Sequence, residues 1–239
     1  MTIQTVEAVL FDIDDTLFDR RWAQREILRR IAARFPSIFD GLAWPRVLAA
    51  FLESDRITTA EINSRSTAGD DVRLRRSARF LRLLGLGEGE DRRHAKRLTA
   101  FYVDHYPDLR APVAEAADVV RGLAERFPLG IVSNGLPDAQ YRKLEALGLR
   151  RAFHCVILSG EIGIWKPDPR IFWRASAALA VPPAACVYVG DKPRVDVVGA
   201  RRAGMRSCWF NPCGKSSESA DVAPDWEIAR LAELDVILR

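Results

Sequence analysis

From residue 111 to the end of the chain, short apolar runs alternate with segments of helical periodicity. The runs predict strands over 129–133, 155–159, 186–189, 207–210 and 226–228, and the segments between them predict helices over 114–126, 139–147, 168–179 and 195–203. Strands separated by helices of about 10 to 15 residues are typical of right-handed crossovers between parallel strands. An earlier apolar run, Val6 to Phe11, ends abruptly in acidic residues, as a buried parallel strand does. The alternation predicts an α/β fold with a doubly wound parallel sheet.

Residues 19–110 contain no convincing strand. Apolar residues at three- and four-residue steps predict a helix from Asp19 that Pro36 stops, and further helices over 45–52, 72–84 and 91–105. The simplest interpretation is a core of residues 1–18 and 111–239, with an all-helical domain, residues 19–110, inserted after the first strand. The stretch 213–223 is rich in Ser and Gly and predicts a loop.

Composition limits the classes of partner and location. Hydrophobic residues make up 48% and charged residues 28% of the 239 residues, as in ordinary soluble proteins. The net charge of +4 comes mostly from arginines scattered beside acidic residues, which argues against a nucleic acid polymer as partner. No apolar run approaches the roughly 20 residues that span a membrane. Because residues 1–7 lack the layout of a signal peptide and the four cysteines suit free thiols, we expect a cytoplasmic protein without membrane association. For its oligomeric state we expect a monomer or a homodimer.

Polar residues follow four apolar runs, where ligands bind in open parallel sheets. These clusters are Asp12-Ile13-Asp14-Asp15-Thr16, Ser133-Asn134-Gly135, Lys166-Pro167, and Gly190-Asp191 with Asp196. Any one cluster could be a helix cap or a turn, since Asp and Ser are preferred there. Together they would bring to one edge of the sheet a lysine, the hydroxyl of Ser133 and four acids, namely Asp12, Asp14, Asp191 and Asp196.

In this order the four clusters resemble the motifs of haloacid dehalogenase-like (HAD) hydrolases. The resemblance covers the whole core, which implies a Rossmann-like fold, and the helical insertion is similar to the C1 cap of that superfamily. Within it, the chain most resembles bacterial pyrimidine 5′-nucleotidases, on the segments 10–18, 131–135, 208–211 and 223–226.

The resemblance implies a phosphatase acting on a small phosphorylated substrate. It implies that Asp12 is the nucleophile and forms an aspartyl phosphate, and that Asp14 protonates the leaving alcohol and then activates water. Lys166 would act in catalysis and bind the phosphate together with Thr16, Ser133 and the backbone amide of Asn134.

The same resemblance implies Mg²⁺ as the cofactor. Its ligands would be carboxylate oxygens of Asp12 and Asp191 and the backbone carbonyl of Asp14, with waters completing the octahedron. Asp196 would hold Lys166 in place or support the waters of the metal ion.

Several alternatives remain open on the sequence alone. The substrate could be a nucleoside 5′-monophosphate, a sugar phosphate, phosphoglycolate or N-acylneuraminate 9-phosphate, because the helical insertion would choose the leaving group. A 2-haloacid dehalogenase is disfavoured, since a departing halide needs no proton and Asp14 would have no task. A non-catalytic phosphate-binding module is disfavoured because Asp12, Lys166 and Asp191 are all present.

Overall fold

A computed structural model describes residues 5–63, 70–86, 91–216 and 223–239. Residues 217–222 of the predicted loop lie outside this range. The chain divides into two compact units, which we call the core unit (Met1–Arg20 with Arg110–Arg239) and the helical unit (Arg21–Leu109).

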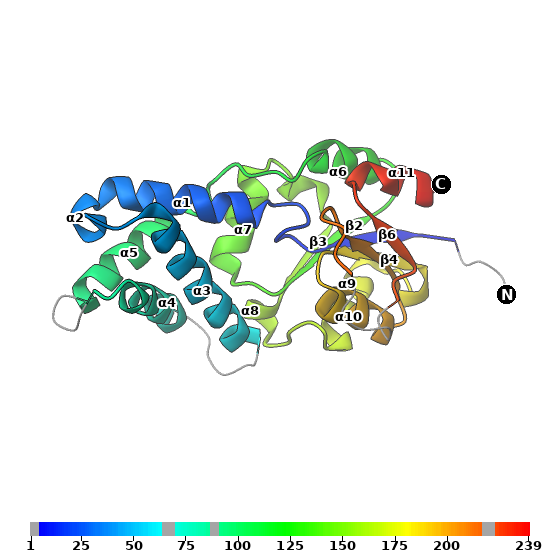
Figure 1. Cartoon of the computed structure of the whole chain (residues 1–239). Coiled ribbons are helices and arrows are strands. Elements are labelled where there is room, and N and C mark those ends of the chain that lie inside the picture. The colour runs from blue at the N-terminus through cyan, green and yellow to red at the C-terminus, as the bar shows by residue number, and fades with distance from the viewer. Residues whose placement is uncertain (1–4, 64–69, 87–90, 217–222) are drawn as a thin grey trace. The chain divides into compact units, whose positions relative to one another are not determined.

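The core unit is built on one six-stranded sheet (Figure 1). Its strands are β1 (Ala8–Phe11), β2 (Leu129–Ser133), β3 (Cys155–Leu158), β4 (Cys186–Gly190), β5 (Arg206–Phe210) and β6 (Trp226–Ile228). They are ordered β3-β2-β1-β4-β5-β6, and every neighbouring pair is parallel. The predicted parallel sheet is therefore confirmed, with each expected strand in place.

Helices cover both faces of the sheet. Those of the core unit are α6 (Ala116–Ala124), α7 (Pro137–Ala146), α8 (Ser159–Ile162), α9 (Pro169–Leu179), α10 (Val198–Arg202) and α11 (Leu234–Ile237), with short turns η1 (Arg150–Ala152), η2 (Pro183–Ala185), η3 (Pro193–Val197) and η4 (Leu231–Glu233). Helices α9 and α10 pack on one face, where Phe172 meets Tyr188 edge to face with ring centroids 4.9 Å apart. Helices α6 and α11 lie on the other face (Figure 1). Burial on both faces explains why the strands are continuous apolar runs instead of alternating ones.

The chain reverses its winding direction at β1. From β1 it proceeds through β2 to β3 at one edge, then returns to β4 on the other side of β1. The crevice outside the carboxyl ends of β1 and β4 is therefore the topological switch point, where open α/β sheets bind ligands. Because Phe11 pairs with both Ile131 and Val189, the residues that follow these three strands emerge side by side.

The described residues of the helical unit contain helices and no strand. The helices are α1 (Arg20–Arg34), α2 (Pro36–Phe39), α3 (Trp44–Asn63), α4 (Asp70–Leu83) and α5 (Asp91–His105). Helix α1 ends before Pro36, as predicted, but Pro36 also begins the short helix α2, because proline fits the first helical turn.

Helix α3 is much longer than the predicted 45–52. Its second half buries polar residues, so the apolar periodicity fades while the helix continues. Asp55 accepts a hydrogen bond from Gln24 Nε2 at 2.7 Å and pairs with Arg76 Nη1 at 3.4 Å. The Arg76 guanidinium also lies 3.6 Å from the centroid of the Tyr102 ring. A buried polar network, not an apolar stripe, holds this end of α3.

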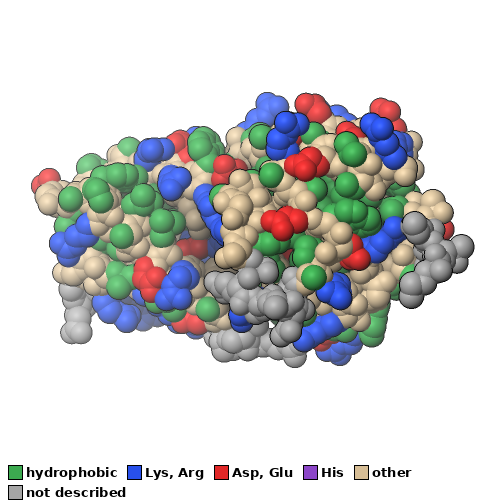
Figure 2. All heavy atoms as spheres, turned by 45° about the vertical axis from the view of Figure 1, so that its right-hand side comes forward, with side chains coloured by type: hydrophobic (Ala, Val, Ile, Leu, Met, Phe, Trp, Pro, Cys, Tyr) green, Lys and Arg blue, Asp and Glu red, His purple; other side chains and the backbone are tan. Residues whose placement is uncertain are grey.

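The surface carries mixed charges. On the face drawn in Figure 2, Lys and Arg side chains are dispersed among acidic and hydrophobic ones. None of the helices in the described ranges combines the length and apolar character that a membrane crossing requires. The four cysteines are free thiols.

Candidate active site

The loop after β1 is a tight turn that fixes Asp12 at the carboxyl edge of the sheet. The backbone amide of Asp12 donates to Val189 O at 2.9 Å, so sheet pairing with β4 extends to this residue. Immediately afterwards, the backbone amides of residues 16–18 all donate to the carbonyl of Ile13, at 2.9 to 3.3 Å. Asp15 adopts a left-handed conformation with φ 59°, which aspartate tolerates better than most residues. Asp12 is thus held by rigid backbone on both sides.

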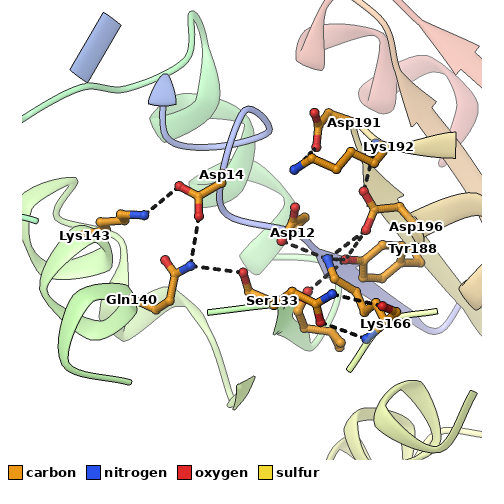
Figure 3. Close-up of polar contacts among 12 residues, drawn as sticks. Asp12, Asp14, Ser133, Gln140, Lys143, Lys166, Tyr188, Asp191, Lys192 and Asp196 are labelled. Carbon is orange, nitrogen blue, oxygen red and sulfur yellow. Dashed lines mark hydrogen bonds and ion pairs between the residues drawn. The ribbon is translucent and has the colours of Figure 1, made fainter. Parts of the chain in front are cut away.

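Lys166 lies at the centre of a buried polar network (Figure 3). Its Nζ is 2.9 Å from Asp12 Oδ1, 2.8 Å from Asp196 Oδ1 and 2.8 Å from the Tyr188 hydroxyl. Tyr188 donates in turn to the carbonyl of Val132 at 2.8 Å, which leaves its oxygen lone pairs to face the ammonium group. Burial alone would lower the pKa of Lys166, but the two carboxylates outweigh burial and raise it. Lys166 therefore carries its positive charge between two acids.

The end of β2 supplies Ser133 and Asn134. Ser133 is buried, and its Oγ lies 3.4 Å from Gln140 Nε2. The Asn134 side chain binds the Lys166 backbone twice: its Oδ1 accepts from Lys166 N at 2.8 Å and its Nδ2 donates to Lys166 O at 3.0 Å. Asn134 therefore fixes the loop that presents Lys166, through a side-chain contact with a residue 32 positions away that no local sequence pattern indicates.

Three carboxylates gather beside Lys166. One oxygen from each of Asp12, Asp191 and Asp196 lies within 4.8 Å of the other two. Burial raises the pKa of Asp12, and burial together with the neighbouring acids raises that of Asp191 to about 7. Asp191 Oδ1 is buried and accepts no hydrogen bond among the described residues, although Lys192 Nζ lies 3.5 Å away. Buried carboxylates this close together repel one another, and a bound cation would relieve the repulsion.

The geometry suits a small divalent ion. In an octahedral Mg²⁺ site with bonds of about 2.1 Å, ligand oxygens lie about 3 to 4 Å apart, so the carboxylates would need to move by less than about 1 Å. Asp196 is already committed to protein contacts, since its Oδ1 pairs with Lys166 and its Oδ2 accepts from Lys192 N at 2.9 Å. Asp12 and Asp191 are therefore the two acids of the cluster with oxygens to spare for a metal.

Asp14 lies on the other side of Asp12, toward α7 (Figure 3). Its Oδ1 is 2.6 Å from Lys143 Nζ, and its Oδ2 accepts from Gln140 Nε2 at 2.9 Å. Burial would raise the pKa of Asp14, but Lys143 and Arg20 outweigh burial and hold this pKa below its usual range. The carboxylate of Asp14 therefore does not join the three-acid cluster. Thr16 is fully buried, and its Oγ1 has no hydrogen-bond partner among the described residues.

The π-helical turn η3 brings Asp196 back to β4 by a route that requires a glycine. A Cβ at Gly190 would lie 2.5 Å from Asp196 Cγ, closer than atoms can pack. We expect Gly190→Ala to push Asp196 away from Lys166, lowering the free energy of unfolding by about 1–3 kcal/mol and reducing turnover. Urea unfolding and steady-state kinetics would measure both.

A matched control for this substitution is Gly122→Ala in α6. A Cβ there would meet nothing within 4 Å. Because alanine favours the helix over glycine, Gly122→Ala is expected to change stability by at most about +1 kcal/mol and to leave turnover unchanged. Equal effects at both positions would mean that contact with Asp196 is not what demands glycine at residue 190.

Four side chains near the predicted residues were not found from sequence: Gln140, Lys143, Tyr188 and Lys192. Gln140 and Lys143 lie within α7 and Tyr188 lies within β4, whereas the site is predicted from polar residues just after strands. One signal was available, since Gln140 and Lys143 are polar residues three apart on the buried face of a helix, where a lysine needs a partner.

The chain is similar in sequence to a family of hydrolases and to several phosphatases. The family model described as haloacid dehalogenase-like hydrolase matches residues 6–204. The phosphoserine phosphatase of Thermus thermophilus is 43% identical over 129 residues, a match that spans 54% of this chain and only 49% of that protein. The glyceraldehyde 3-phosphate phosphatase of Methanopyrus kandleri is 34% identical over 239 residues, covering 98% of this chain and 97% of that protein.

Other relatives include the pyrimidine 5′-nucleotidase YjjG of Escherichia coli and an (S)-2-haloacid dehalogenase of a Pseudomonas species. Among solved structures, the putative HAD-hydrolase YfnB of Bacillus subtilis superposes with a TM-score of 0.81 at 25% identity, covering 99% of this chain and 100% of that one. The Bacillus protein was solved bound to magnesium.

Proposed function

The chain belongs to the haloacid dehalogenase-like hydrolases, and we propose that it is a magnesium-dependent phosphatase of small phosphate monoesters. The observation that carries the proposal is the position of Asp12. It follows a central strand at the switch point, 2.9 Å from a buried ammonium group and beside two further acids. A carboxylate is a weak nucleophile in water, and rigid placement beside cations is what makes it effective.

Asp12 and Asp191 are the side chains that would hold the metal ion, with the backbone carbonyl of Asp14. The buried Asp191 Oδ1, which accepts no hydrogen bond from any residue that the structure describes, supports this assignment, and so does the magnesium bound to the Bacillus subtilis relative. When bound, Mg²⁺ would offset the negative charge of phosphate next to several acids. Asp196 would keep Lys166 in place and support the waters of the metal ion.

The reaction would proceed in two displacements on phosphorus. In the first, an Asp12 oxygen forms a bond to phosphorus and the ester P–O bond breaks. Asp14, which Lys143 and Arg20 keep ionised in the free enzyme, would take up a proton from solvent as the anionic substrate binds beside it and pass this proton to the leaving alcohol. In the second, Asp14 takes a proton from water, whose oxygen attacks the phosphorus of the aspartyl phosphate and releases inorganic phosphate and free Asp12. Lys166, Ser133, Thr16 and the Asn134 amide would bind the phosphate oxygens throughout. The Asn134 amide lies close to the start of α7, and anions are favoured at the start of a helix.

Dehalogenation is the rival activity, because a haloacid dehalogenase is among the relatives. A halide leaves without a proton, so an acid at position 14 would serve no purpose there. Here the acid is present, and two buried side chains are devoted to holding it. These two contacts with Asp14 favour an alcohol leaving group, and therefore a phosphate ester.

The identity of the leaving group is the finer part of the proposal. The names of the relatives span amino acid, triose and nucleotide phosphates. We propose that the helical unit acts as a cap and selects among these phosphate esters. We place a pyrimidine nucleoside 5′-monophosphate first because residues 10–18 and 131–135 resemble those of pyrimidine 5′-nucleotidases. A monomer or homodimer in the cytoplasm remains our expectation.

A screen of phosphate esters would test this substrate assignment. Release of inorganic phosphate should be measured for about a hundred esters with Mg²⁺ present, including pyrimidine and purine nucleotides, sugar phosphates, phosphoglycolate and phosphoserine. Pyrimidine nucleoside 5′-monophosphates are expected among the best substrates by kcat/KM. A clear preference for sugar phosphates would remove the nucleotide assignment, whereas hydrolysis of none of them would remove the phosphatase itself.

A further inference from the structure

Both carboxylate oxygens of Asp14 are taken by side chains of α7. Lys143 Nζ lies 2.6 Å from Oδ1, and Gln140 Nε2 donates to Oδ2 at 2.9 Å. From this geometry, and resting on the proposed function of Asp14, we infer that Lys143 and Gln140 are positioning residues that fix the orientation of Asp14 for proton transfer. The phosphate contacts are assigned to Lys166 and Ser133, and of the two α7 side chains only Gln140 also lies near one of them, 3.4 Å from Ser133 Oγ.

Lys143 is placed where only a specific partner justifies it. Its side chain is 5% exposed, and a buried ammonium group destabilises a protein unless an anion and hydrogen bonds accompany it. The anion is Asp14, and the Lys143 ammonium also lies 4.9 Å from the centroid of the Phe18 ring. Asp14 and Phe18 both belong to the turn that follows β1, so Lys143 connects α7 to this turn on the side away from Lys166.

Gln140 links the acid to the end of β2. Its Nε2 lies between Asp14 Oδ2 and Ser133 Oγ, at 2.9 and 3.4 Å. A Cβ at Gly135 would lie 2.1 Å from this same nitrogen, so Gln140 can occupy its place only because residue 135 is glycine. Glycine is therefore needed at position 135 because it leaves room for the Gln140 side chain, which orients Asp14.

An ion pair that only anchors α7 would affect folding and not the chemistry of Asp14. A positioning role predicts a different kinetic result. Without Lys143, the Asp14 carboxylate can rotate, and misplacement of a catalytic group by about 1 Å costs roughly 10²-fold in rate. Phosphate binding does not involve Lys143, so Lys143→Met should lower kcat by about 10²-fold and change KM by less than about threefold.

A double-mutant cycle separates the two roles. Release of inorganic phosphate from an alkyl phosphate ester, whose alcohol leaving group needs a proton, should be measured for Lys143→Met, Asp14→Asn and the double variant, all with Mg²⁺ present. If Lys143 acts through Asp14, the loss of about 10²-fold should shrink to less than about threefold once Asp14 is asparagine. Arg142→Met, which removes a cation one residue away on the same helix, should keep kcat within about twofold.

Three outcomes would overturn the inference: unchanged kcat in Lys143→Met, the same loss in both backgrounds, or a loss that lies in KM alone. If Lys143→Met does not fold, as judged by circular dichroism, the same cycle with Gln140→Leu decides by the two kcat criteria alone, because Gln140 also lies 3.4 Å from Ser133 Oγ and its loss can change KM. Failure of the proposed function is a separate result, because it would appear as turnover retained by Asp12→Asn, whatever happens at Lys143.

Discussion

Asp12→Asn is expected to abolish hydrolysis of a generic aryl phosphate such as p-nitrophenyl phosphate, lowering kcat by on the order of 10⁴-fold or more. An amide has no anionic oxygen to attack phosphorus, so the aspartyl phosphate cannot form. The fold should survive, because Lys166 keeps Asp196 and Tyr188 as partners. Release of the phenolate measures turnover, and mass spectrometry after acid quenching should find phosphate on Asp12 only in the unmodified enzyme.

The matched control is Asp118→Asn, the same change in α6 of the core unit. The Asp118 side chain is 91% exposed, and within the described part of the chain it forms a surface ion pair with Arg121, of a kind that contributes little. Turnover by Asp118→Asn should equal that of the unmodified enzyme. Activity retained by folded Asp12→Asn would refute the nucleophile assignment.

The sequence was informative about the core because both of its signals are local. An apolar run such as 129–133 is buried on both faces, so its composition alone marks a parallel strand. Each of β1, β2 and β4 is followed at once by polar residues, and parallel strands must end at the same edge. The convergence of Asp12, Lys166, Asp191 and Asp196 could therefore be predicted without knowing a single contact.

Short or irregular elements could not be predicted in this way. Helix α8 has four residues, too few for a period to be recognised. The predicted helix 195–203 is in fact the π-helical turn η3 followed by α10, because the wider turn lets Asp196 fold back against Gly190. Such local changes follow from tertiary contacts that no window of sequence contains.

The partners of the predicted residues were hidden for a related reason. Lys143 and Asp14 are 129 residues apart, and Tyr188 sits within β4, where it looks like one more core residue. The acids that converge at the strand ends are buried, and their negative charges need cations and hydrogen-bond donors from elsewhere in the chain. Two buried cations, Lys143 and Lys166, stand on opposite sides of the first acidic turn, each holding one of its acids. The site is thus divided into a nucleophile side and a proton-transfer side.

On the nucleophile side, removal of the metal ion is expected to abolish turnover, by about 10³-fold or more. Two like charges about 4 Å apart cost roughly 4 kcal/mol at an effective dielectric near 20. A phosphate approaching Asp12, Asp191 and Asp196 meets several such repulsions, which Lys166 only partly offsets. Treatment with a chelator should stop phosphate release, and added Mg²⁺ should restore it. Undiminished activity of the metal-free protein would count against the whole site.

Calorimetric titration of the metal-free protein with Mg²⁺ gives a readout that does not depend on activity. Asp191→Asn is expected to weaken Mg²⁺ binding at least about tenfold, because it removes an anionic ligand, whereas the exposed control Asp118→Asn should bind Mg²⁺ like the unmodified protein. The affinity of the unmodified protein should also fall as the pH drops from 8 to 6, since burial raises the pKa of Asp191 to about 7 and a proton then competes with the metal. Equal Mg²⁺ affinity in Asp191→Asn and the unmodified protein would place the metal ion elsewhere and leave the cluster of Asp12, Asp191 and Asp196 without its assigned cation.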